Sequence, residues 1–114
     1  MLTIDALRGF GANVDEGMAR CMNNSDFYIR LVNMAVGDAG FEKLKECLDG
    51  GDLTGAFEAA HALKGVLGNL SLTPIYEPAS QITELLRARA ETDYSGLLQE
   101  ILTQRDKLKA LCGA

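Results

Sequence analysis

The only histidine of this chain, His61, lies in a run of helix-forming residues that also contains Lys64, Gly65 and Gly68. At about 100° per residue, these four positions fall on one stripe of a helix. The stripe combines a nucleophilic imidazole, a cation one turn further on and two positions without a side chain. Each glycine inside a helix costs roughly 1 kcal/mol relative to alanine. The pattern therefore predicts that a large partner comes close to the imidazole.

These residue types suit the transfer of a phosphoryl group. An imidazole is a nucleophile near neutral pH, because its unperturbed pKa is about 6.5, and a ring nitrogen can attack phosphorus. The phosphoryl group spreads negative charge over its oxygens during transfer, and Lys64 is placed to stabilise that charge. Nothing else in the chain resembles a general base, a nucleotide site or a metal cage. We therefore expect a relay without a cofactor of its own, whose partner supplies Mg²⁺.

The hydrophobic pattern predicts helices nearly throughout the chain. Candidate N-caps are Asn13, Asn23 or Asn24, and Asp52. The expected helices cover about residues 4–10 and 14–22, then 24–49 with a kink or break at Gly37 and Gly40, then 53–71 and 73–89. After a last loop at residues 91–93, the final helix is defined by Leu97 or Leu98, Ile101, Leu108 and Leu111. Four long amphipathic segments joined by short loops favour an all-α fold, an antiparallel up-down four-helix bundle. The two short N-terminal helices would pack across one end, and the bundle core would span about 24–112 of a single domain, 1–114.

The helix that carries His61 has its apolar face about 120° away from the histidine stripe. That face consists of Leu53, Ala56, Ala60, Leu63, Leu67 and Leu70. His61 is thus expected at a flank of the bundle, partly exposed. The next helix should start at Thr73-Pro74 and be distorted by Pro78 in its second turn. Its core side is predicted to consist of Ile75, Ala79, Ile82, Leu86 and Arg89.

The composition of the chain limits which classes of molecule it can bind. The chain has 114 residues, a formal net charge of −5 and no tryptophan. An acidic domain lacks the cationic face that binding to nucleic acid or to an anionic membrane requires. No apolar stretch approaches the roughly 20 residues that span a bilayer, and no secretory signal begins the chain. The three cysteines show no metal or disulfide spacing, so we expect free thiols and a cytoplasmic monomer.

The histidine stripe also carries a family resemblance. The run His61-Ala62-Leu63-Lys64-Gly65, followed by Asn69-Leu70, resembles the signature of histidine-containing phosphotransfer (HPt) domains. Residues 13–22 and Asp26-Phe27-Tyr28 are similar to the N-terminal part of bacterial members, and Gly51-Asp52 precedes the motif helix as it does there. The resemblance covers essentially the whole chain.

The resemblance implies a role for each residue of the motif. His61 would be phosphorylated, Lys64 would stabilise the phosphoryl charge, and a docking surface of Ala62, Gly65 and Gly68 would admit a receiver domain. The implied partners are response-regulator receiver domains and a sensor or hybrid histidine kinase. The sequence departs from the family pattern at Ser71, which is often glycine, and at Pro78. The chain would be a phosphoryl-transfer intermediate without a kinase domain, either stand-alone or excised from a hybrid kinase.

The residues around His61 also share features with other classes of helical protein. Glu58 and His61 have the Glu-x-x-His spacing of di-iron bundles, but those need a second such motif and two more glutamates. The dimerisation helices of histidine kinases normally have an acidic residue after the histidine, where this chain has Ala62. A bundle that only binds a receiver or kinase, without phosphotransfer, remains the alternative. Glu84, Glu91 and Glu100 are expected to be solvated surface.

Overall fold

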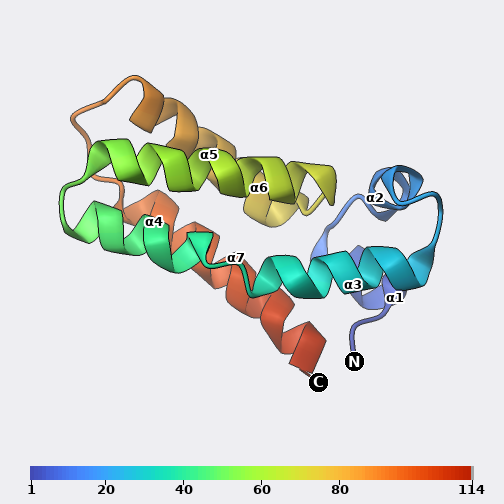
Figure 1. Cartoon of the computed structure of the whole chain (residues 1–114). Helices are drawn as coiled ribbons and strands as arrows, with labels where there is room; N and C mark the ends of the chain where they lie inside the picture. Colours follow the sequence, from blue (N-terminus) through green and yellow to red (C-terminus); the bar gives the residue numbers. More distant parts are fainter. Residues whose placement is uncertain (114) are drawn as a thin grey trace.

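The computed structural model describes residues 1–113, and all regular structure within this part of the chain is helical (Figure 1). The all-α class predicted from the hydrophobic pattern is thereby confirmed. The helices are α1 (Ile4–Phe10), α2 (Val14–Arg20), α3 (Ser25–Val36), α4 (Gly40–Asp49), α5 (Leu53–Asn69), α6 (Thr73–Arg87) and α7 (Ser95–Gly113).

Helix α5 occupies the centre of the arrangement. It packs against α4 on one side and α6 on the other, and α6 packs in turn against α7. Consecutive helices from α4 to α7 run in opposite directions (Figure 1). Helix α3 continues beyond α4 roughly along the same line, while α1 and α2 lie at the end of the molecule where α5 stops (Figure 1). Both α1 and α3 also contact α7.

Side-chain hydrogen bonds cap three helices at the residues that the sequence predicts. The side chains of Asn13, Asn24 and Asp52 accept hydrogen bonds from backbone N–H groups of the first turns of α2, α3 and α5. The predicted break between residues 37 and 40 separates α3 from α4. At this break the Asp38 carboxylate accepts a hydrogen bond of 2.7 Å from the Gly40 N–H. Side-chain capping therefore sets where α2, α3 and α5 begin.

Two local expectations need correction, and a third is not tested. Helix α2 ends at Arg20 and not near residue 22, because Met22 and Asn23 adopt a left-handed backbone with φ of 55°. Helix α6 continues through Pro78, since a proline in the second turn removes only one backbone hydrogen bond, and the expected local distortion there stays a prediction. Arg89 is not a core residue: it lies beyond α6, is exposed and donates a hydrogen bond of 3.2 Å to Thr54 Oγ1.

The core leaves one face of α5 free. Alanine and leucine residues bury the opposite face, and from α5 they are Ala56, Ala59, Ala60, Leu63 and Leu67. They pack with buried residues of the neighbouring helices, such as Leu44, Ile82 and Ile101. On the remaining face, His61, Ala62 and Gly65 are exposed, whereas Lys64 and Gly68 are half-buried. Among the described residues, no helix is long and apolar enough to cross a membrane.

Candidate functional site

His61 lies near the middle of α5, and its side chain is exposed. The alternation on α5 between buried and exposed positions follows from its packing: Ala60 and Leu63 are fully buried, whereas Ala62 and Gly65 are exposed. The predicted position of the histidine at the edge of the core is confirmed. An imidazole in this position is accessible to a second macromolecule.

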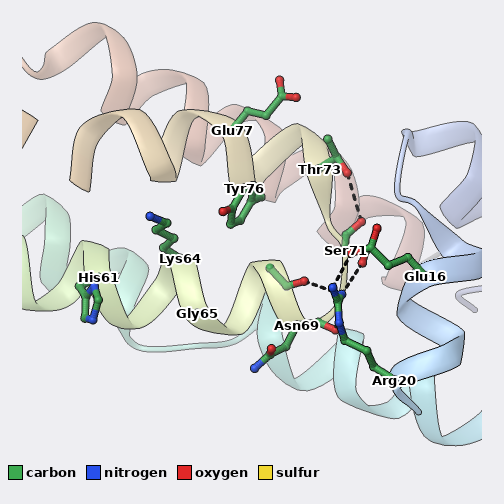
Figure 2. A pocket seen from close by; sticks show the side chains of 11 residues that line it. Glu16, Arg20, His61, Lys64, Gly65, Asn69, Ser71, Thr73, Tyr76 and Glu77 are labelled. Carbon is green, nitrogen blue, oxygen red and sulfur yellow. Dashed lines mark hydrogen bonds and ion pairs between the residues drawn. The ribbon is translucent and has the colours of Figure 1, made fainter. Parts of the chain in front are cut away.

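Four predicted site residues border one open cleft of about 600 Å³ between α5 and α6 (Figure 2). They are His61, Lys64, Gly65 and Gly68. Ala62, the fifth predicted residue, is exposed on α5 but does not line this cleft. In Figure 2 the side chain of Lys64 projects toward α6, and the imidazole of His61 projects toward the opposite edge of α5. The imidazole of His61 and the ammonium group of Lys64 therefore lie on opposite edges of the histidine stripe of α5.

The two glycines of the stripe have different surroundings. A Cβ atom at Gly65 would have no atom within 4 Å, so this position is open to a partner. A Cβ atom at Gly68 would lie 3.0 Å from Cε1 of Tyr76 in α6. The packing of α5 against α6 thus explains why residue 68 is a glycine, and the sequence alone did not reveal this. Its expected part in docking stays a prediction.

An aromatic contact holds the imidazole from within its own helix. Phe57 stacks on His61, with ring centroids 5.6 Å apart and an angle of 15° between the ring planes. The guanidinium carbon of Arg87, from α6, lies 5.0 Å from the centre of the Phe57 ring. Sequence reasoning did not select Phe57 or Arg87. The four-residue spacing between Phe57 and His61 places both on one helix face and was the signal available.

The charges around the imidazole include one carboxylate. Arg87 Nε donates a hydrogen bond of 2.9 Å to Glu84 Oε2. This bond and the charge of Arg87 lower the pKa of Glu84, and the nearby Lys64 and His61 lower it further. Glu84 is exposed, as expected, but it is also an ionised neighbour of the site. Within residues 1–113, Lys64 forms no ion pair, and no cluster of three side chains suitable for a metal ion occurs.

Helix α2 contacts the end of the cleft that lies away from His61. Arg20 of α2 donates hydrogen bonds to the Gly68 carbonyl oxygen at 2.9 Å and to Ser71 Oγ at 2.8 Å, and it also pairs with Glu16 (Figure 2). Ser71 adopts a left-handed backbone with φ of 54°, the conformation that favours glycine. The guanidinium group thus adds a second donor to the Gly68 carbonyl, which also accepts a hydrogen bond of 3.1 Å from the Ser71 N–H.

An apolar groove of about 330 Å³ borders the opposite flank of the stripe. Its apolar lining comes from α3 and from the end of α5 and consists of Leu31, Met34, Ala35, Val66 and Leu70. Met34 is 66% exposed, which is unusual for a large apolar side chain. The exposed face of α5 therefore lies between a polar cleft and an apolar groove.

Comparison with models of protein families found one family whose model matches part of this chain. The model for the Hpt domain matches residues 37–112, about two thirds of the chain. The matched segment includes all of α4, α5 and α6 and most of α7, with His61, Lys64, Gly65 and Gly68. Searches of curated proteins and of solved structures found no significant match.

Proposed function

This chain belongs to the Hpt domain family, whose members act in histidine phosphotransfer, and from that premise we propose that it is a phosphorelay intermediate. It accepts a phosphoryl group on His61 from the aspartyl phosphate of a receiver domain and passes the group to another receiver. The observation that carries this proposal is the exposed imidazole beside the open position of Gly65 on the same helix face.

The transfer is a displacement at phosphorus. The lone pair of one imidazole nitrogen attacks the phosphorus atom, the bond between phosphorus and the aspartate oxygen breaks, and the aspartate leaves as a carboxylate. The proton on the other ring nitrogen stays there, so phosphohistidine forms as an imidazolium. Transfer to a second receiver runs the same steps in reverse. The receiver domain supplies Mg²⁺ on its own acidic residues, and this chain needs no cofactor.

Lys64 is the residue that stabilises the phosphoryl charge. Its ammonium group forms no ion pair within the described chain and lies on the same stripe as the imidazole. A flexible lysine can therefore follow the phosphoryl oxygens during transfer. The ionised Glu84 offsets part of this positive charge before phosphorylation. The partly offset charge favours a phosphoryl group that is bound temporarily on His61 and then released to the next receiver.

The docking surface lies along the exposed face of α5. Gly65 and Ala62 offer little side-chain bulk, and the groove around Met34 offers apolar area. The chain carries a net charge of −5, and a receiver site is acidic, so apolar contact supplies the affinity that charge attraction does not. We take α3 to α7, about residues 24–112, as an antiparallel four-helix bundle in which α3 and α4 together form the first helix. The bundle acts as a rigid support for this surface, and α1 and α2 form an N-terminal extension.

The partners in this scheme are response-regulator receiver domains and a sensor or hybrid histidine kinase. The domain acts as a monomer, because one exposed stripe serves each receiver in turn. Free thiols at Cys21, Cys47 and Cys112 fit a reducing compartment, and we place the relay in the bacterial cytoplasm. The alternative is a bundle that binds a receiver without phosphotransfer, and the presence of His61 on the docking stripe favours the relay.

The test is phosphoryl transfer from an isotopically labelled receiver domain in the presence of Mg²⁺. The chain should acquire a label that is lost in acid and kept in alkali. His61→Gln should remain folded and unlabelled. Lys64→Ala should be labelled more slowly, because it loses charge stabilisation but keeps the nucleophile. Labelling of a folded His61→Gln variant would contradict the assignment, and binding without labelling by several receivers would support the alternative.

A further inference from the structure

We propose that Phe57 is a positioning residue for phosphoryl transfer: its ring holds the imidazole of His61 in one orientation, and Arg87 with Glu84 holds the Phe57 ring. This inference rests on the proposed phosphotransfer function. It joins residues of α5 and α6 into a sequence of contacts, Glu84 to Arg87 to Phe57 to His61, that ends on the nucleophile.

The need for such a contact follows from the exposure of His61. An exposed side chain samples several rotamers, and only a fraction of them presents a ring nitrogen to the receiver. Within residues 1–113 the imidazole forms no hydrogen bond, so the ring contact with Phe57 is the interaction that restrains it. Its geometry, 5.6 Å between centroids and 15° between planes, lies in the range of favourable stacked aromatic pairs.

A stacked neighbour restrains the imidazole without blocking it. The attacking lone pair lies in the plane of the imidazole, at the ring edge, whereas Phe57 covers a ring face. Both ring nitrogens therefore remain accessible while rotation of the ring is restricted. A hydrogen bond to one nitrogen would restrain the ring as well, but it would occupy that nitrogen and change its basicity.

The Phe57 ring needs support of its own, because it is only half-buried. The Arg87 guanidinium lies 5.0 Å from the ring centre, within the range of a cation–π interaction. Glu84 orients Arg87 through the hydrogen bond to Nε, which leaves the planar guanidinium free to lie over the ring. Arg87 thus connects α6 to the nucleophile on α5 through an aromatic ring.

The test compares Phe57→Leu, which keeps apolar bulk but removes the ring face, with Phe57→Tyr, which keeps the face. Phe10→Leu is the control, since Phe10 is also half-buried but lies on α1. Single-turnover transfer from a labelled receiver is measured over a range of receiver concentrations. The His61 ring-proton resonances are measured on the unphosphorylated protein, because a stacked ring shifts them by its ring current.

Phe57→Leu should lower the transfer rate at saturating receiver roughly two- to tenfold, the range that the energy of an aromatic pair implies. The receiver concentration for half-maximal rate should stay unchanged, and the His61 resonances should move toward those of an unstacked imidazole. Phe57→Tyr and Phe10→Leu should behave like the wild type in both measurements.

Two negative results are distinguishable. A labelled wild type together with unchanged rate and resonances in Phe57→Leu would overturn the positioning role and leave the proposed function standing. The same holds for a variant whose half-maximal concentration rises at constant maximal rate, because Phe57 would then act in docking. A wild type that no receiver labels would overturn the proposed function itself, and with it the role of Phe57.

Discussion

Gly68 of α5 and Tyr76 of α6 face each other along the cleft: a Cβ atom on Gly68 would lie 3.0 Å from Cε1 of Tyr76. Gly65, almost one turn earlier on the same stripe, would have no atom within 4 Å of its Cβ. The two glycines therefore exclude side chains for different reasons. Gly68 makes room for a ring of its own protein, whereas Gly65 leaves room for a partner.

Substitution by alanine should affect stability differently at the two glycines. Gly65→Ala should raise the free energy of unfolding by about 0.5–1 kcal/mol, because alanine favours the helix and meets no neighbour. Gly68→Ala should gain less or lose stability, because the Tyr76 ring must shift. Urea unfolding of both variants measures the difference. Equal stabilisation would show that Tyr76 yields freely.

Gly65→Arg extends this comparison to function. The arginine side chain should project into open space, and arginine favours a helix almost as much as alanine, so the variant should be at least as stable as the wild type. It should also block a receiver from reaching His61, and transfer should fall at least about tenfold, the effect of about 1.4 kcal/mol of lost binding. Transfer is measured with a labelled receiver. An unchanged rate would place the docking surface elsewhere.

Much of this fold follows from local sequence. The caps at Asn13, Asn24 and Asp52 and the break near Gly37 were predictable, because each depends on a few neighbouring residues. The exposure of His61 was predictable from the helical period. Arg89 was misplaced because the period was extended past the end of α6, where the backbone turns left-handed.

The surroundings of the site were harder to predict, because they join residues far apart in the chain. The contact between Gly68 and Tyr76 depends on how α6 returns along α5, which periodicity within one helix cannot reveal. The apolar groove joins Met34 to Val66, more than 30 residues further along the sequence. The Arg87 contact with Phe57 depends in the same way on the packing of α6 against α5.

Met34 provides a test of the docking groove. Met34→Lys should weaken receiver binding, because a charge would enter the apolar contact, and should leave the transfer rate at saturation unchanged. The receiver concentration for half-maximal transfer should rise about tenfold, equivalent to about 1.4 kcal/mol. Met22→Lys is the matched control, since Met22 is 83% exposed and lies between α2 and α3, outside the groove lining. Equal effects of both variants would point to net charge and not to the groove.

Arg20 should stabilise the end of α5. Arg20→Ala removes donors to the Gly68 carbonyl and to Ser71 Oγ and should lower the free energy of unfolding by about 1–2 kcal/mol. Arg8→Ala is a suitable control, because Arg8 forms an exposed ion pair with Asp15, worth about 0–1 kcal/mol. Urea unfolding compares the variants. If both lose the same small amount, the bonds from Arg20 to α5 contribute no more than a surface ion pair.

Tyr28 should make stability depend on alkaline pH. Its hydroxyl is buried and donates a hydrogen bond of 2.7 Å to the Leu70 carbonyl oxygen. Burial, with a smaller contribution from Cys21, raises the pKa of Tyr28 to about 12. An unfolded tyrosine ionises near pH 10. The stabilisation from Tyr28 is therefore complete below about pH 10 and is lost as the pH rises toward 12, because the unfolded chain releases the proton first.

Tyr28→Phe isolates this contribution from the ionisation of other groups. At neutral pH the variant should be less stable by about 1–3 kcal/mol, because the Leu70 carbonyl loses its buried donor. The difference between wild type and variant should shrink between about pH 10 and pH 12, since phenylalanine has no proton to lose. Urea unfolding of both proteins across this range measures the difference. If it stays constant, the Tyr28 pKa is the same in the folded and unfolded chains, and its hydroxyl contributes hydrogen bonding alone.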